Sequence, residues 1–392
     1  MKIVHTSDWH IGRRWKGIRR LDEMERVLEH LLSFIEARGV ELVLHSGDLF
    51  DTRNAPADAE HLANRFFVRL KKLGVEMVVV AGNHDDPSRF EARAMLAEYA
   101  GVHLLGRPRR AHEGGVIPIE AKSGARAIVA ALPFASPGAW VSALDLAGEE
   151  ADARGKYARM FKLACDHLCE SFTKKENRDA IKLVVSHTHI HGAHFGDSER
   201  RVHVGEEWAA TTQCLPTTAN YIALGHIHKA QRLDGLLPAY YAGSPLQLDF
   251  GEAGQQKTFN YIEAEGDRPP VVEAIPYQGG KELIDLRVTL EELESSAERH
   301  RDAGWLRVTV PLAAQDPNIN RKVRKLLPNA LVVRVELPQQ EVVDSARPGA
   351  GAAPEAHFRA YHMRYHQRQP EPTIVEAFNS LHKEAEERTP QN

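Results

Sequence analysis

Cysteine is scarce in this sequence of 392 residues, which contains only Cys165, Cys169 and Cys214. Three irregularly spaced cysteines do not provide the framework of disulfides that stabilises small secreted domains. Cys165 and Cys169 stand four residues apart in a stretch with helical periodicity, so they could bind a metal ion together. We favour two thiols packed in a core, because free cysteine is usually buried.

Long hydrophobic runs are also missing. No apolar segment approaches the roughly 20 residues that a helix needs to cross a bilayer. The first ten residues, MKIVHTSDWH, lack the apolar stretch of a secretory signal. We therefore expect a cytoplasmic protein with no membrane partner.

An excess of positive charge is the third absence, since the formal net charge is −4. A protein that holds nucleic acid through its overall charge is usually basic. If this chain binds nucleic acid, the contacts must therefore be local, or a partner must supply part of them.

Five segments combine a short apolar, β-branched run with a polar cluster. They span residues 2–10, 41–48, 76–85, 181–189 and 220–228. Apolar runs of this length predict buried strands. Residues 19–39 and 58–74 have the apolar spacing of amphipathic helices, and each segment ends on glycine.

Strands that alternate with helices predict an α/β fold. In such sheets, ligands gather at the carboxyl ends of the strands, and every polar cluster falls at such an end. After about residue 230, short strands with turn signals predict antiparallel additions.

The C-terminal third predicts a different organisation. Residues 282–340 follow a strand, helix, strand, helix, strand order, residues 344–356 are rich in Ala, Gly and Pro, and residues 373–389 form an amphipathic helix. That helix could dock on its own protein or on a partner. We predict a catalytic domain at 1–279, a small α+β domain at 280–340, a linker at 341–372 and a docking helix at 373–392.

The polar clusters supply seven candidate metal ligands. These are Asp8, His10, Asp48, Asn83, His187, His226 and His228. Carboxylate and amide oxygens combined with imidazoles suit Mn²⁺, Fe or Zn²⁺ rather than Ca²⁺. On an extended chain, the two side chains of a D-x-H or H-x-H pair point to the same side.

Asp48 stands alone between the pairs, so its two oxygens could bridge two metal ions. Two ions ~4 Å apart would activate a water molecule and hold the phosphate oxygens of an in-line displacement. The leaving oxygen then needs a proton, and His84, next to Asn83, is the natural donor. A carboxylate near His84 would favour its protonated form, so we predict an Asp51–His84 dyad as the general acid.

The fourth polar cluster, SHTHIHGAH, holds more histidines than one ligand requires. We choose His187 because it ends the apolar run, with His189 as the second choice. His191 and His194 are expected to be loop residues near the substrate. Each short motif alone is weak, but all of them in this order, each after a predicted strand, form a strong signal.

These motifs resemble the calcineurin-like metallophosphoesterase superfamily. Its pattern of D-x-H, G-D-x-x-D, G-N-H-[DE], H and G-H-x-H appears here as SDWH, GDLFD, GNHD, SHTH and GHIH. The sequence is most similar to the SbcD nuclease branch, through HTSDWHIG, HSGDLFDTRNAP and YAGSPLQLDFGE. The resemblance is strong over about residues 1–260 and is one of layout beyond them.

The resemblance implies a fold, a ligand set and partners. The fold is a sandwich of two central β-sheets flanked by helices, with a small α+β capping domain and a C-terminal helix. His84 would contact the scissile phosphate. One metal ion would be held by Asp8, His10, Asp48 and His228, and the other by Asp48, Asn83, His187 and His226. The family uses Mn²⁺ and cleaves DNA ends and hairpins in repair and recombination. Its members act with an SbcC-type ATPase, so a homodimer within a heterotetramer is expected.

Residues 12–20, GRRWKGIRR, follow the first ligand pair and are strongly basic. Arg13, Arg14 and Lys16 could contact DNA phosphates, and Trp15 could stack on a base. The alternative is a solvated basic loop whose Trp15 packs on the protein body. Further candidates for phosphate contacts are Arg53, Arg89, Arg200 and Arg201.

Two other functions stay open at this stage. The same ligands would serve a phosphodiesterase for small molecules or a protein phosphatase, because all of these hydrolyse phosphate esters. A scaffold with a vestigial site is the third possibility, although the ligand set is complete.

Overall fold

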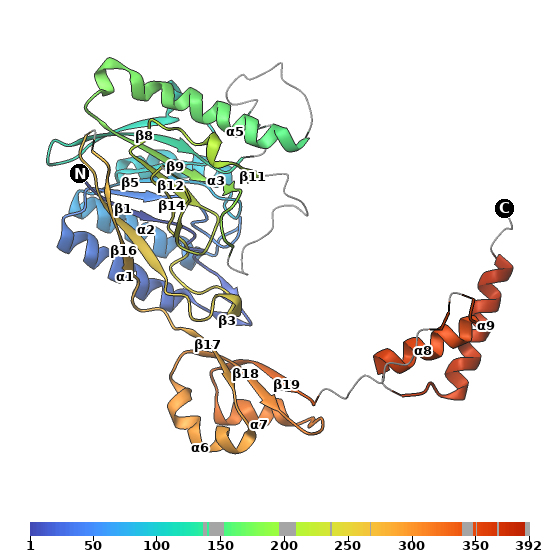
Figure 1. The fold of residues 1–392 in the computed structure, drawn as a ribbon. Coiled ribbons are helices and arrows are strands. Elements are labelled where there is room, and N and C mark those ends of the chain that lie inside the picture. Colours follow the sequence, from blue (N-terminus) through green and yellow to red (C-terminus); the bar gives the residue numbers. More distant parts are fainter. Residues whose placement is uncertain are drawn as a thin grey trace. The chain divides into compact units, whose positions relative to one another are not determined.

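The computed structural model describes residues 1–135, 139–140, 153–195, 209–235, 237–266, 268–338, 348–349, 351–366 and 368–388. Two six-stranded sheets form its centre (Figure 1). The first sheet has the order β16 (Val271–Pro276), β15 (Thr258–Glu263), β1 (Lys2–Thr6), β4 (Leu42–His45), β5 (Glu76–Val80) and β6 (Val102–Leu105). The second has the order β13 (Gln231–Arg232), β14 (Ala239–Tyr241), β12 (Tyr221–Gly225), β9 (Ile181–His187), β8 (Arg126–Leu132) and β7 (Val116–Glu120).

Helices cover the outer face of each sheet, as predicted. Helices α1 (Leu21–Arg38), α2 (Ala57–Leu73) and α3 (Pro87–Tyr99) pack on the first sheet, and α5 (Ala153–Cys169) packs on the second. Helices α1 and α2 end on Gly39 and Gly74, whose positive φ angles of 64° and 69° form left-handed caps. Cys165 and Cys169, both on α5, are buried in the core, as expected for packed thiols.

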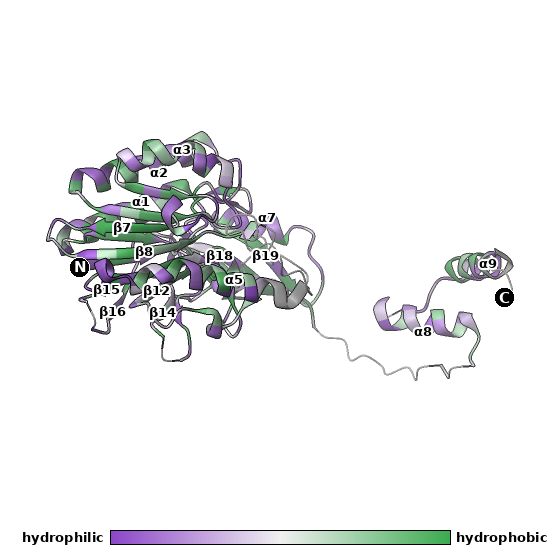
Figure 2. Cartoon of the chain, turned by 90° about the horizontal axis from the view of Figure 1, so that it is seen from above, coloured by the Kyte–Doolittle hydropathy of each residue, from purple (hydrophilic) through white to green (hydrophobic). Residues whose placement is uncertain are grey.

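The core between the two sheets consists of aliphatic side chains from both, such as Ile3 and Val78 from the first sheet and Val129 and Val185 from the second. Strands that are buried on both faces need continuous apolar runs, which explains the sequence pattern. Figure 2 shows hydrophobic residues along β7 and β8 and mixed hydropathy along α1 and α3. Among the described residues, no helix combines the length and the apolar character needed to cross a membrane.

Strand directions match the expectation with one exception. Strands β15 and β16 are antiparallel, as predicted for the additions after residue 230. Strand β14 instead runs parallel to β12. The prediction failed there because a three-residue strand carries no signal of its direction, which depends on where the loop after β12 returns the chain.

The remaining elements are short strands, turns of 3₁₀ helix and the C-terminal elements. The short strands are β2 (Arg14–Trp15), β3 (Ile18–Arg19), β10 (His189–Ile190) and β11 (Ala209–Ala210). The 3₁₀ turns are η1 (Ala111–Glu113), η2 (Glu170–Thr173), η3 (Lys175–Asn177), η5 (Thr212–Cys214) and η6 (Phe250–Glu252). The C-terminal elements are β17 (Leu283–Arg287), α6 (Leu290–Arg301), β18 (Trp305–Pro311), α7 (Ile319–Leu326), β19 (Ala330–Glu336), α8 (Pro354–His366) and α9 (Pro372–Arg388).

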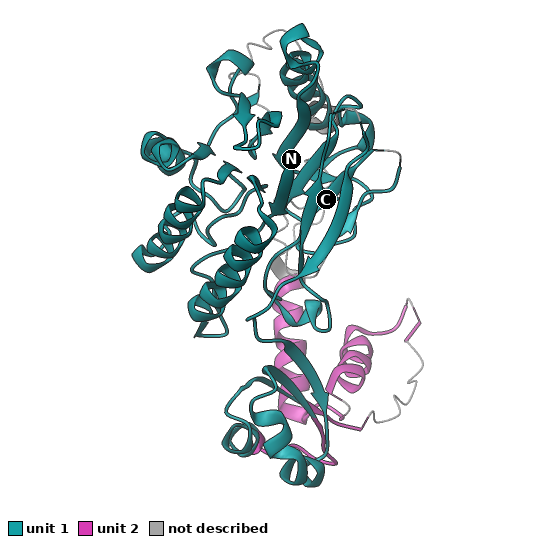
Figure 3. Cartoon of the chain, turned by 90° about the vertical axis from the view of Figure 1, so that its left-hand side faces the viewer, with its two compact units in different colours: residues 1–309, 320–334 teal, residues 310–319, 335–392 magenta. Residues whose placement is uncertain are grey.

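The chain divides into compact units differently from the predicted domains (Figure 3). One unit comprises residues 1–309 and 320–334, and the other comprises 310–319 and 335–392. Most of the predicted capping domain therefore belongs to the same unit as the sandwich. The buried pair of Arg20 and Glu23 explains this, because the Glu23 carboxylate accepts hydrogen bonds from the Lys281 amide at 2.9 Å and the Trp305 indole at 2.9 Å.

The second unit contains a helix that the sequence did not predict. Residues 354–366, within the predicted linker, form α8. Its Phe358 stacks on Phe378 of α9 with ring centroids 4.3 Å apart. The Ala-, Gly- and Pro-rich stretch at 344–356 overlaps the first turn of α8, so its composition masked the start of the helix.

Candidate metal centre

The candidate ligands gather at the carboxyl ends of five parallel strands. His187 is the last residue of β9, and the other six ligands lie in the loops that follow their strands. Strand β1 ends at Thr6, before Asp8, and β12 ends at Gly225, before His226. Four of the seven have positive φ angles, which non-glycine residues rarely adopt. They are Asp8 (51°), His10 (45°), Asp48 (53°) and His226 (100°).

This backbone geometry replaces the extended conformation that the spacing suggested. Each left-handed residue costs on the order of 1–3 kcal/mol and persists only where surrounding contacts enforce it. Such residues cluster at functional sites, so four of them among seven candidate ligands is an independent sign of function. Nearby glycines let the backbone lie close to the ligand side chains. A Cβ on Gly82 would collide with the Asp48 carboxylate, and a Cβ on Gly47 would collide with the His187 ring.

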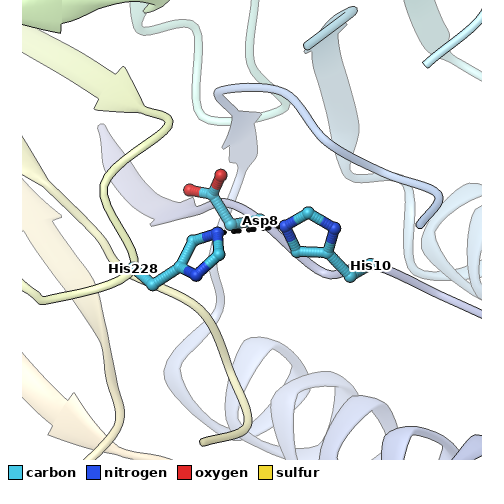
Figure 4. Close-up of side chains that lie close together, drawn as sticks. All are labelled: Asp8, His10 and His228. Atoms are coloured by element: carbon cyan, nitrogen blue, oxygen red, sulfur yellow. Dashed lines mark hydrogen bonds between the residues drawn. The ribbon is translucent and has the colours of Figure 1, made fainter. Parts of the chain in front are cut away.

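Asp8, His10 and His228 form the first half of the centre (Figure 4). Their ligand atoms lie within 4.8 Å of one another, and all three side chains are buried. The Nε2 atoms of His10 and His228 are 3.1 Å apart. Two ring nitrogens that face each other need a shared proton or a cation between them, so this arrangement fits a metal ion.

Asn83, His187 and His226 form the second half. The Asn83 side-chain oxygen lies 3.0 Å from His187 Nε2 and 3.0 Å from His226 Nδ1. Asp48 stands between the halves, because its Oδ2 is 3.6 Å from His187 Nε2 and 3.7 Å from His10 Nε2. The structure thus brings all seven predicted ligands together, with Asp48 between the two halves.

Burial sets the charge of these ligands. Desolvation lowers the pKa of His10 to about 4, against the opposing effect of Asp51 and Asp48. Desolvation likewise lowers the pKa of His187 and His226. Burial alone would raise the pKa of Asp48. The positive charge that the imidazoles of His187, His84 and His10 carry when protonated outweighs burial and lowers this pKa below its ordinary value. Neutral imidazoles and an ionised carboxylate are the forms that bind divalent metal ions.

Hydrogen bonds behind the ligands fix their orientation. His187 Nδ1 lies 2.8 Å from the Ser46 carbonyl oxygen, and the His226 amide donates to the Asp8 carboxylate at 3.1 Å. Glu252, fully buried, lies 3.5 Å from His228 Nδ1 and pairs with Lys257 at 2.6 Å. Ligating histidines usually bond a carboxylate or carbonyl in this way, which sets the ring tautomer.

Sequence reasoning missed two of these supporting carboxylates. Glu252 ends the segment YAGSPLQLDFGE, which carried the family resemblance but had no chemical role assigned. Asp85 ends GNHD, and its buried carboxylate accepts hydrogen bonds from the amides of Gly82, Leu49 and Phe50. Burial, followed by the Asp48 charge, raises the pKa of Asp85 to about 7. Through its three hydrogen bonds, the Asp85 side chain connects the loop after β5, which holds Gly82, to the loop after β4, which holds Leu49 and Phe50.

Replacing Glu252 with glutamine is expected to weaken metal binding by about 10- to 100-fold, because the amide no longer supplies the charge that orients His228. The measurement is the Mn²⁺ concentration at half-maximal hydrolysis of bis-p-nitrophenyl phosphate. Glu265→Gln, which removes an exposed partner of Arg268, is the matched control. An activation midpoint equal to that of the wild type would contradict this role.

Asp51 and His84 are in contact, but through the Asp51 backbone carbonyl and not through its carboxylate. His84 Nδ1 lies 2.7 Å from the backbone carbonyl oxygen of Asp51. The Asp51 carboxylate instead contacts Arg13 at 3.0 Å and His10 Nδ1 at 3.5 Å. A carbonyl oxygen accepts the Nδ1 proton and orients the ring without adding a full negative charge, so the charge-based argument for this dyad was wrong.

The other histidines of the fourth cluster lie outside the ligand set. The His189 ring packs against His226 with centroids 6.4 Å apart and against Phe195 at 4.7 Å. His191 and His194 are exposed loop residues, held through their backbone amides by Ala210 and Gln231. The choice of His187 over His189 agrees with the contacts to Asn83 and Asp48.

The basic segment at 12–20 forms a hairpin of β2 and β3. Its turn, Lys16–Gly17, has two positive φ angles, which suit a tight hairpin. The Trp15 ring is only 7% exposed; it packs on Phe250 and donates to Asp249 at 3.3 Å. This packing favours the alternative in which Trp15 stabilises the loop, and we do not include it among the proposed DNA contacts.

Arg14, Lys16 and Arg53 are exposed and stay candidates for phosphate contacts. Arg13 is one-fifth exposed and paired with Asp51, and Arg89 pairs with Glu60 at 3.0 Å, so DNA would have to compete with these carboxylates. Arg200 and Arg201 lie outside the described residues.

Comparison with known proteins places the site in a family context. The family description "Calcineurin-like phosphoesterase" matches residues 1–230. Relatives that are the SbcD component of the nuclease SbcCD include one from Bacillus subtilis, 31% identical over 87% of this chain and 87% of the relative. Another, from Escherichia coli, is 28% identical over 88% and 87%. A third, from Rhodobacter capsulatus, is 30% identical over 75% and 76%. All the candidate ligands fall within the matched residues 1–230.

Proposed function

The chain belongs to the calcineurin-like phosphoesterase family and to its SbcD nuclease members, and we propose on this basis that it hydrolyses phosphodiester bonds of DNA at the candidate metal centre. It is a metal-dependent nuclease. The observation that carries the proposal is the convergence of seven ligands from five strand ends around Asp48.

Divalent metal ions, when bound, polarise phosphate oxygens and lower the pKa of water. The family implies divalent metal ions, and we propose two Mn²⁺ ions, the first held by Asp8, His10, Asp48 and His228 and the second by Asp48, Asn83, His187 and His226. The chain's own residues orient the reaction. Glu252 and the Ser46 carbonyl hold the histidine rings, and His84 supplies a proton to the leaving oxygen.

The test uses an end-labelled linear DNA duplex and the purified chain. Cleavage is expected with Mn²⁺ and is expected to stop when EDTA removes the metal. Hydrolysis of bis-p-nitrophenyl phosphate, measured in parallel, reports on the metal centre alone. Turnover of that diester without any cleavage of DNA would overturn the polymer substrate and favour small phosphodiesters. Loss of both activities, with metal bound, would favour a scaffold.

We also propose partners for two apolar surfaces. Helix α9 packs on α8 through Phe378 and leaves Ile374 and Leu381 exposed, which suits docking on an SbcC-type ATPase. Helix α3 exposes Met95, Leu96 and Tyr99 by 81%, 78% and 88%. Exposed apolar side chains gathered on one short helix suit a contact between two copies of the chain, as a homodimer within a heterotetramer requires.

We propose that the predicted domains differ in function, although the compact units of the structure have other boundaries. Residues 1–279 would carry the chemistry, 280–340 would cap it, and the helix at 373–392, of which 373–388 are described, would dock the partner. We propose that the protein acts in the cytoplasm, in DNA repair and recombination.

A further inference from the structure

Two phenylalanines flank the second half of the metal centre without any role in binding metal. The half-buried Phe134 ring lies against His187 with centroids 6.1 Å apart. Phe195 lies against His189 at 4.7 Å, and His189 lies against His226 at 6.4 Å. A continuous series of rings therefore leads from a metal ligand to Phe195.

Phe195 is unusual because 48% of its side chain is exposed. An exposed phenyl ring is unfavourable in water, yet the segment that leads up to Phe195 is held in place. The backbone of His194 exchanges two hydrogen bonds with the Gln231 side chain, at 2.9 Å and 2.7 Å, and the His191 amide donates to Ala210 at 2.7 Å. Gln231 follows His228 by three residues, so Phe195 is anchored to the segment that carries two ligands.

An aromatic ring that is fixed, exposed and next to a phosphodiester centre has a specific use. Every nucleobase has a flat face that stacks on an aromatic side chain without sequence preference. In DNA, a phosphodiester at the metal centre would carry a nucleoside on each side, so a ring beside the centre could contact a base. Trp15, the aromatic residue that the sequence suggested for this purpose, is buried.

We propose that Phe195, supported by His189, stacks on a nucleobase beside the scissile phosphate and so determines the preference for nucleic acid over simpler phosphodiesters. This inference rests on the proposed function. The stacking orients the strand across Asn83, His187 and His226, and it involves no metal ligand directly. Its contribution is to substrate binding rather than to the chemical step.

The test compares the wild type with Phe195→Ala on two linear duplexes, with Mn²⁺ present. The duplexes are identical except that one replaces the nucleosides flanking the first cleaved phosphate with abasic residues. Phe195→Ala is expected to lower kcat/KM on the intact duplex about 10- to 100-fold, mainly through KM. Removing the bases should lower the wild-type value similarly and leave the Phe195→Ala value nearly unchanged.

Two further variants and two further measurements test the interpretation. Phe195→Trp should keep the wild-type preference for intact bases, since it retains a stacking surface. Tyr365→Ala, in helix α8, removes another exposed aromatic side chain and should behave like the wild type. Metal content and melting temperature should be the same in the wild type and Phe195→Ala.

The abasic duplex could lower kcat/KM of Phe195→Ala by the same factor as it lowers kcat/KM of the wild type. This result would contradict the stacking and leave the nuclease proposal intact. Equal KM values for the wild type and Phe195→Ala on the intact duplex would also contradict the stacking. Failure of the wild-type chain to cut either duplex would overturn the nuclease proposal and the stacking together.

Discussion

Replacing Asp48 with asparagine is expected to lower kcat/KM for bis-p-nitrophenyl phosphate by on the order of a thousandfold or more, since metal ions contribute several kcal/mol to such reactions. Asp48 is buried and lies between the two halves of the centre, 3.6 Å from His187 and 3.7 Å from His10. Asparagine keeps the shape but carries no charge. The side-chain oxygen of asparagine could still accept the hydrogen bond that the His84 amide now donates to Asp48 Oδ1 at 2.8 Å. The loop that carries His84 should therefore stay folded.

Metal content separates this role from a general loss of structure. After dialysis against Mn²⁺, elemental analysis should find two metal ions per wild-type chain and fewer in Asp48→Asn. Asp166→Asn is the matched control, because Asp166 pairs with Lys162 on an exposed helix surface. A variant that retains two ions and activity within a few fold of the wild type would show that Asp48 does not bridge the metals.

Replacing His84 with alanine is expected to lower DNA cleavage by about 10²- to 10⁴-fold, the range for loss of a general acid. Hydrolysis of bis-p-nitrophenyl phosphate should fall much less. Its leaving group departs readily as an anion, whereas the alkoxide that leaves from DNA needs a proton. His84 is half-buried, lies 4.7 Å from the His10 ring and is oriented by the Asp51 carbonyl.

The comparison of the two substrates distinguishes three roles for His84. Unequal losses with metal content unchanged would support proton donation. Equal losses with metal unchanged would contradict it and indicate a contact to the phosphate instead. Loss of a metal ion would make His84 a ligand, which is geometrically conceivable because it groups with His10 and Asp48. His112→Ala, on an exposed histidine, is the control.

Much of the fold could be predicted because its signals are local. Apolar runs followed by polar clusters indicated β1, β4, β5, β9 and β12, and apolar spacing with a terminal glycine indicated α1 and α2. The backbone of the ligand pairs was not predictable in this way. The chain after β1 is not extended, as the D-x-H spacing suggested, because contacts with the loop after β4 hold Asp8 and His10 in left-handed conformations.

The roles of individual side chains were less predictable. Trp15 was judged by its basic neighbours, but Phe250, more than 200 residues away, buries its ring. The expected effect of a nearby carboxylate paired Asp51 with His84, but Arg13 and His10 contact the Asp51 carboxylate instead. Both outcomes depend on contacts between distant segments, which spacing along the chain does not encode.

The sequence by itself determined the family, the ligand types and the end of each strand at which they occur, because residue chemistry and strand order are local properties. The residue pattern alone did not say which ligands face each other, and the family resemblance only implied it. The tertiary structure shows His10 next to His228, and Asn83 next to His187 and His226. It also placed Glu252 behind His228 and left Phe195 exposed beside the centre. The order of strands within each sheet, and the packing of the two sheets, bring these residues together from distant parts of the chain.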